Sequence, residues 1–107
     1  MITAKYKQGF TKPDMLVDIY LDEVPYGLTD KTIKLRFSRA GQPALWERPM
    51  TVVGAPTAGR VAYTWQAADR AVSGVYDCLI FVEHAGDTEP IAEFQIEIET
   101  TVPKASA

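Results

Sequence analysis

Few residues of this sequence belong to the types that carry out acid–base or metal chemistry. His84 is the only histidine, and the nearest carboxylates along the chain are those of Glu83, Asp87 and Glu89. A metal site needs several ligands that converge on one ion. One histidine beside acidic residues at a glycine-containing turn is more typical of a solvated loop, so we expect no metal site at His84.

A second acidic group, Asp18, Asp22 and Glu23, could supply the oxygen ligands that calcium prefers. In one extended strand Asp18 and Asp22 would share a face, but they would lie about 13 Å apart. The sequence therefore favours an exposed acidic face over a cation site.

Nucleophilic catalysis needs an activated serine or cysteine with a base beside it. The chain has no Gly-x-Ser-x-Gly motif, and its one cysteine, Cys78, lies in the most apolar run, where a thiol is inert. Gly54 and Gly59 flank Ala-Pro-Thr-Ala, but no Gly-Lys-Ser or Gly-Lys-Thr follows, which excludes a phosphate-binding loop. Glu97 and Glu99 alternate with apolar residues and suit the solvent face of a sheet. We expect no enzyme, and no catalytic, cofactor-binding or metal-binding residues.

Length and charge narrow the class of protein. The chain has 107 residues, 47% of them hydrophobic, and a net charge of −3, which is typical of one globular domain. Lys and Arg are scattered singly, whereas nucleic-acid binders carry a basic patch, so we expect no nucleic-acid partner. The first seven residues lack the apolar core of a signal peptide, and no apolar run approaches the ~20 residues of a membrane span. We therefore expect synthesis in the cytoplasm and no membrane span.

The dominant pattern is alternation of apolar and polar residues, which predicts half-buried strands. It is clearest at 33–37, 61–65 and 94–98, where the apolar residues are Ile33, Leu35, Phe37, Val61, Tyr63, Trp65, Phe94, Ile96 and Ile98. Residues 75–82 are almost continuously apolar and suit a central strand buried on both faces. Leu16 to Leu21 predicts a strand with Val17, Ile19 and Leu21 on one face. Residues 2–7 and 50–53 are weaker candidates.

These seven strands, separated by Gly, Pro and Asp, indicate an all-β sandwich or barrel. Gly86-Asp87 predicts a hairpin loop between two strong strands. Residues 66–71 are the one helical candidate, at most a turn or two long. We expect one domain over residues 1–100 and a flexible C-terminal tail over 101–107.

The stretch from Asp69 to Cys78 resembles the corner that leads into strand F of immunoglobulin-like domains. There an acidic residue precedes Tyr-x-Cys, and the tyrosine hydroxyl bonds to backbone a few residues upstream. Tyr76 and Cys78 have that spacing. Trp46 is the candidate for the core tryptophan, and Leu35 stands roughly where the partner cysteine would be, so no disulfide forms. The corner narrows the expected fold to an immunoglobulin-like β-sandwich of about seven antiparallel strands.

Large side chains in or near the loops are the candidates for a binding surface. They are Tyr6, Phe10, Tyr26, Trp46 and Met50. Aromatic residues and Met are enriched at the centres of interfaces. If two or three of them are exposed together, they mark a binding patch.

Residues 16–99 resemble the small immunoglobulin-like domains of bacteriophage tail and baseplate proteins, as in the N-terminal domain of the baseplate upper protein family. The most specific part is Gly59-Arg60-Val61-Ala62-Tyr63-Thr64-Trp65, followed at short distance by Gly74-Val75-Tyr76. Other matching parts are Thr32-Ile33-Lys34-Leu35-Arg36-Phe37 and Met50-Thr51-Val52-Val53.

The resemblance implies a non-catalytic virion structural or assembly protein, associated with the tail or baseplate. Its partners would be other virion proteins and copies of itself, contacted through a sheet edge or the segment before Pro13. It would be made in the host cytoplasm and end in the virion. The alternative is a bacterial adhesion or carbohydrate-binding immunoglobulin-like module, against which the missing signal peptide argues.

Overall fold

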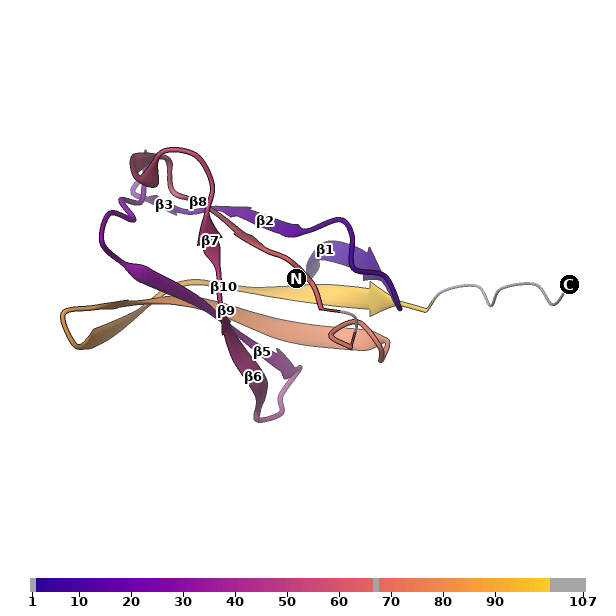
Figure 1. The fold of residues 1–107 in the computed structure, drawn as a ribbon. Coiled ribbons are helices and arrows are strands. Elements are labelled where there is room, and N and C mark those ends of the chain that lie inside the picture. The colour runs from indigo at the N-terminus through magenta and orange to yellow at the C-terminus, as the bar shows by residue number, and fades with distance from the viewer. Residues whose placement is uncertain (1, 67, 101–107) are drawn as a thin grey trace, which may run out of the picture.

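A computed structural model describes residues 2–66 and 68–100, and these residues form an all-β domain (Figure 1). The expected tail, 101–107, lies outside the described residues. The strands are β1 Ile2–Lys7, β2 Met15–Asp18, β3 Tyr20–Leu21, β4 Val24–Pro25, β5 Thr32–Arg39, β6 Ala44–Pro49, β7 Thr51–Val52, β8 Arg60–Tyr63, β9 Gly74–His84 and β10 Asp87–Glu99, with a short 3-10 helix, η1, at Pro56–Ala58.

The strands make two facing layers. One is a five-stranded sheet in the order β1-β10-β9-β5-β6, and the other is a three-stranded sheet in the order β2-β8-β7. Figure 1 shows β2, β7 and β8 above the long strands β9 and β10. Neighbouring strands are antiparallel except that β1 runs parallel to β10. Strands β3 and β4 form a separate two-stranded hairpin.

The apolar residues of the alternating runs meet between the two layers, as predicted. The side chains of Leu35, Phe37, Val61, Cys78, Ile80 and Ile96 are fully buried there. Phe94 is only half-buried, because it lies beside the open edge between β1 and β2. Burial of this kind contributes roughly 25 cal/mol for each Å² of apolar surface, so the core is the main source of stability.

Strand β9 is central, as the apolar run predicts, with β10 on one side and β5 on the other. The prediction that it is buried on both faces is wrong for most of its length, because no second layer of the described chain covers the outer face of the sheet, which leaves Val75, Asp77 and Leu79 partly exposed. It turns into β10 through Ala85 and Gly86, which both have positive φ angles (52° and 85°). Two consecutive residues of this kind make the tight turn that suits the twist of a hairpin. The hairpin is therefore confirmed, with its turn one residue earlier than Gly86-Asp87.

Phe37 lies at the centre of an aromatic cluster. Its ring stacks on Trp46 and Tyr76, with centroids 4.7 and 4.6 Å away, and meets Trp65 edge-on at 5.8 Å. The buried tryptophan is Trp65, with 2% of its surface exposed, while Trp46 is half-buried on the edge strand β6. The prediction that Trp46 is the core tryptophan is therefore wrong. Trp46 lies on β6, an edge strand that the sequence pattern did not indicate, and a side chain at the edge of a sheet is only partly covered.

Leu35 cannot occupy the position of a cross-sheet cysteine. It lies on β5, in the same sheet as Cys78 on β9, and its register partner there is Ile80. A disulfide that joined the two sheets through Cys78 would need its second cysteine on the three-stranded sheet. Cys78 is free.

Two local predictions are corrected. The expected strand from Leu16 to Leu21 stops at Asp18, and Leu21 is 62% exposed although Val17 and Ile19 point inward. The described residues among 66–71 form turns, with N–H groups of Asp69 and Ala71 donating to carbonyls three residues earlier. The carboxylate of Asp69 accepts a hydrogen bond from the N–H of Gln66, which closes the chain locally without a helix.

The corner before β9 carries the predicted tyrosine bond. The hydroxyl of Tyr76 donates to the carbonyl oxygen of Val72 at 2.6 Å. Asp69, which is 8% exposed, accepts hydrogen bonds from Arg48, from the Tyr63 hydroxyl at 2.6 Å and from the N–H of Gln66 at 2.8 Å. These bonds fix the corner to β6 and β8.

Arg70, one residue further along, is completely buried. Its guanidinium donates to the carbonyl oxygens of Lys7 and Lys12 at 2.9 and 3.2 Å, and its centre lies 5.0 Å from the ring of Tyr6. Removal from water lowers the pKa of this guanidinium. The side chain ties the connection between β1 and β2 to the corner.

Candidate functional site

The residues with potential for metal chemistry do not converge. The Nδ1 atom of His84 lies 3.1 Å from the carbonyl oxygen of Asp30, at an exposed turn. Within the described chain, no three His, Cys, Asp or Glu side chains are grouped closely enough to hold a metal ion. The imidazole thus serves to link the β9–β10 turn to the segment before β5.

The acidic residues Asp18, Asp22 and Glu23 are also separated. Asp18 accepts two hydrogen bonds from Arg60, at 2.6 and 3.1 Å, and this bonding lowers the pKa of its carboxyl group. Asp22 and Glu23 form the turn of the β3–β4 hairpin, with φ angles of 52° and 67°. The expectation that Asp18 and Asp22 share one strand face is wrong, because the strand ends between them.

Cys78 has the environment of an inert core residue. It has no exposed surface, and burial raises the pKa of its thiol to about 12. A thiol that stays protonated at neutral pH is a poor nucleophile.

The outer face of the five-stranded sheet is covered by ion pairs between neighbouring strands. They are Lys5–Glu97, Lys7–Glu99, Lys34–Glu83 and Arg36–Glu47. Glu97 and Glu99 thus lie on the solvent side, as their alternation indicates. Charges of both signs are therefore paired across neighbouring strands on this face.

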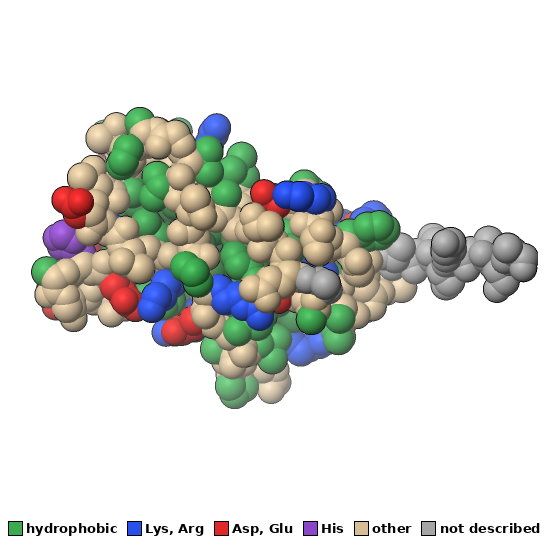
Figure 2. All heavy atoms as spheres, in the orientation of Figure 1, with side chains coloured by type: hydrophobic (Ala, Val, Ile, Leu, Met, Phe, Trp, Pro, Cys, Tyr) green, Lys and Arg blue, Asp and Glu red, His purple; other side chains and the backbone are tan. Residues whose placement is uncertain are grey.

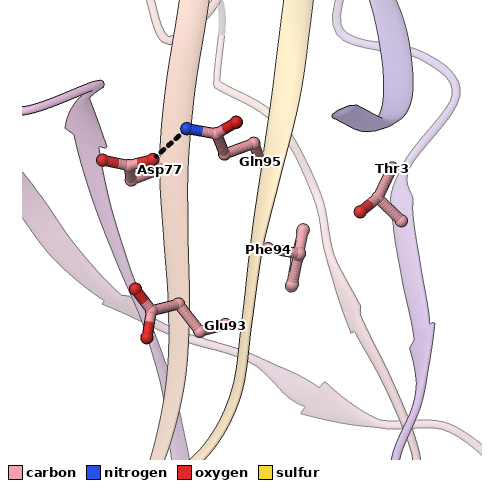
Figure 3. Close-up of a pocket in the computed structure, with 5 residues that line it drawn as sticks. All are labelled: Thr3, Asp77, Glu93, Phe94 and Gln95. Atoms are coloured by element: carbon pink, nitrogen blue, oxygen red, sulfur yellow. Dashed lines mark hydrogen bonds between the residues drawn. The ribbon is translucent and has the colours of Figure 1, made fainter. Parts of the chain in front are cut away.

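A depression on the same sheet is lined by Thr3, Asp77, Glu93, Phe94 and Gln95 (Figure 3). The Asp77 carboxylate accepts a hydrogen bond from Gln95 at 2.9 Å and another from the N–H of Gly41 at 3.2 Å. In Figure 3 Glu93 lies on the side of Asp77, while Phe94 points toward Thr3. The lining contains no cysteine, histidine or lysine, and Asp77 is already engaged, so we assign no chemistry to it.

The large side chains that are candidates for a binding patch do not gather into one. Tyr6 and Met50 belong to the core, and Tyr26 and Trp46 are half-buried. Phe10 alone is exposed, at 53%.

The most exposed group of apolar side chains instead lies on the β3–β4 hairpin. Tyr20, Leu21 and Val24 expose 57%, 62% and 62% of their surface. Leu21 pairs with Val24 across the hairpin, and Tyr20 pairs with Pro25, so Leu21 and Val24 share one face of the hairpin and Tyr20 lies on the other. Sequence alternation missed this group because it placed Leu21 on the buried face. The consecutive turn residues Asp22-Glu23 are the signal that could have revealed a reversal of the chain.

The base of the hairpin is held firmly. The N–H of Tyr26 donates to the carbonyl oxygen of Ile19 at 2.8 Å, and Ile19 in turn donates to Gly59 at 2.8 Å. Gly59 has a φ of 71°, and a Cβ atom there would lie 2.5 Å from the Ile19 oxygen, so only glycine fits. Buried Leu28 anchors the chain that follows. The exposed tip is therefore mounted on a rigid base.

Several carboxylates lie in the hairpin turn, beside it, or at the β9–β10 turn. Asp22, Glu23, Asp30, Asp87 and Glu89 make no ion pair with any described residue. Asp22 and Glu23 form the hairpin turn, Glu89 lies beside Leu21 and Val24, and Asp30 and Asp87 lie at the β9–β10 turn. Figure 2 shows hydrophobic side chains at the surface of the left end of the molecule, near the purple His84. The hairpin is thus apolar on its strands and acidic at its turn, while Lys31 lies beside Leu21 and Val24, and Arg60 lies beside Tyr20.

No protein-family model matches this sequence, and no curated protein is significantly similar to it. The resemblance to phage domains therefore rests on the sequence motifs alone. Among the described residues there is no helix with the length and apolar character needed to cross a membrane.

Proposed function

We propose that the domain is an immunoglobulin-like sandwich without a disulfide. In that fold one sheet holds strands C, F and G and the other holds B, E and D. Strands β5, β9 and β10 have the order of the first set, and β2, β8 and β7 have the order of the second. The hydrogen bond from Tyr76 to Val72 corresponds to the tyrosine corner of such domains.

We propose that the protein is a non-catalytic assembly module that binds another protein through its β3–β4 hairpin. In line with the resemblance, the partner is a component of a bacteriophage tail or baseplate. The observation that carries the proposal is the rigidly mounted, exposed hairpin, which presents Leu21 and Val24 on one face and Tyr20 on the other. A small group of apolar and aromatic side chains supplies most of the binding energy in protein interfaces.

The two carboxylates of the hairpin turn, Asp22 and Glu23, favour a basic partner surface. An apolar pocket bordered by Lys and Arg would receive Leu21 and Val24 and complement Asp22 and Glu23. Electrostatic attraction of this kind speeds association and weakens with salt. We therefore expect the association rate constant to fall as ionic strength rises, with a smaller change in the dissociation rate constant.

A photo-cross-linking experiment tests this proposal. The photoreactive residue p-benzoylphenylalanine replaces Tyr20, where an aromatic ring already stands exposed, and purified virions that carry the variant are irradiated. The control replaces Leu45, which is 57% exposed on β6, far from the hairpin in sequence. We expect one virion protein to be cross-linked from position 20 and none from position 45.

The partner identified in this way is then purified and titrated. We expect Leu21→Ser combined with Val24→Ser to weaken its binding at least tenfold, and Leu45→Ser to leave binding unchanged. Absence of the protein from purified virions by mass spectrometry would overturn the virion role. Equal cross-linking from positions 20 and 45 would overturn the role of the hairpin.

A further inference from the structure

The two main sheets have four edge strands, and three of them carry features that discourage pairing with another chain. β1 presents Lys5 and Lys7, β6 ends in Arg48 and Pro49, and β7 is only two residues long. Charged residues, proline and short length are the usual protection of exposed edges. β2, with the sequence Met-Leu-Val-Asp, contains neither lysine nor proline.

The backbone of β2 has free hydrogen-bonding groups on its outer side. Ile19 donates its N–H to Gly59 of the segment that leads into β8. Because these groups alternate along an antiparallel strand, Met15 and Val17 also face β8, while Leu16 and Asp18 direct their N–H and C=O groups away from it. In the described chain β2 pairs with β8 alone. An added strand would therefore find a ready set of donors and acceptors.

An apolar cleft adjoins this free edge. It lies where β2 faces β1 across the open side of the sandwich, and its lining is Thr3, Ala4, Tyr6, Met15, Leu16, Val17, Asp18 and Phe94. Leu16 is 56% exposed at its lip. The one charged side chain of the lining, Asp18, is already paired with Arg60. The occupant of this edge should therefore be apolar and uncharged at its centre.

We propose that the occupant is β2 of a second copy of this chain, paired antiparallel about a two-fold axis. Residues directly opposite each other must point to the same face of a sheet. Leu16 then lies opposite Leu16 of the second copy, and Met15 lies opposite Val17. The outward groups of the two Leu16 residues make two hydrogen bonds across the axis. The three-stranded sheets join into one continuous sheet, and the two apolar clefts are brought together.

The charges near the axis are compatible with this register. Asp14 comes opposite Asp18 of the second copy, which would repel if both were bare carboxylates. Each brings its own cation, however: Lys12 lies 2.9 Å from Asp14, and Arg60 lies 2.6 Å from Asp18. Each end of the paired strands therefore carries two positive and two negative charges. The pairing uses a surface other than the β3–β4 hairpin, so it stands or falls separately from the proposed function.

A cysteine placed on the axis tests the register. Directly opposed residues joined by two hydrogen bonds have Cα atoms about 5.5 Å apart, within the range of disulfides. We expect Leu16→Cys to form a disulfide-linked dimer at micromolar concentration under mild oxidation. Leu45→Cys is the matched control, since Leu45 is 57% exposed on a protected edge. The native Cys78 is buried and should not interfere.

Light scattering provides the second readout. We expect the unmodified protein to have the mass of a dimer, Leu16→Lys to raise the dimer dissociation constant at least tenfold, and Leu45→Lys to leave it unchanged. Substitution of Leu21 and Val24 by serine should leave the dimer intact. A monomeric mass up to about 1 mM, or cross-linking of Leu16→Cys no faster than that of Leu45→Cys, would overturn the proposal.

Discussion

Replacing Asp69 by alanine tests whether the buried ion pair at the corner before β9 holds the two sheets together. Only 2% of the Asp69 side chain is exposed. Its removal leaves the hydroxyl of Tyr63 and the N–H of Gln66 without their acceptor, and the guanidinium of Arg48 keeps, among the described residues, only the Tyr63 oxygen, at 2.8 Å. Loss of one partner of a buried ion pair costs about 3–5 kcal/mol.

That cost is a large share of the roughly 5–15 kcal/mol that stabilises a domain of this kind. The assay is urea unfolding followed by tryptophan fluorescence. Asp18→Ala is the matched control, because Asp18 also binds an arginine, Arg60, but its side chain is 40% exposed. We expect no measurable change from the control, since exposed ion pairs contribute little. A loss for Asp69→Ala no larger than that for Asp18→Ala would refute the reasoning.

Three further predictions concern single residues. Tyr76→Phe removes the hydrogen bond to Val72 and should lower the free energy of unfolding by about 1 kcal/mol in the same urea assay. Glu23→Gly should raise it by about 1 kcal/mol, because glycine adopts the positive φ of 67° without strain; an unchanged midpoint would contradict this. Burial raises the pKa of the Cys78 thiol to about 12, so the unfolded chain releases this proton at lower pH than the folded one. Stability should therefore be retained below about pH 9 and fall between pH 9 and 12, by about 4 kcal/mol from this group; Cys78→Ala should show a shallower fall across that range.

The core could be predicted from the sequence because period-two alternation is imposed by one buried and one solvated face. Ile33, Leu35 and Phe37 are all buried as that pattern requires. The hairpin could not be predicted in the same way. Leu21 continues the alternation of Val17 and Ile19, and only the chain reversal at Asp22 places it in solvent.

Tertiary contacts explain the other departures. The sequence of strand β6 does not alternate between apolar and polar residues, because at this edge even the inward-facing side chains are partly exposed. The position of Trp46 could therefore not be predicted from the pattern. The tyrosine bond at the corner was predictable, since it needs only the local spacing of Tyr76. Its neighbour Asp69 depends on Arg48 and Tyr63, which are distant in sequence.

The parallel pairing of β1 with β10 has a consequence for biosynthesis. The first strand of the chain completes its sheet only beside the last one, through register partners from Ile2↔Gln95 to Lys7↔Glu99. During translation both β1 and β9 emerge before β10, and they stay without this neighbour until residues 87–99 have left the ribosome. Pairing between such distant segments is slow to form. Chains that stall before residue 95 should be aggregation-prone and dependent on chaperones.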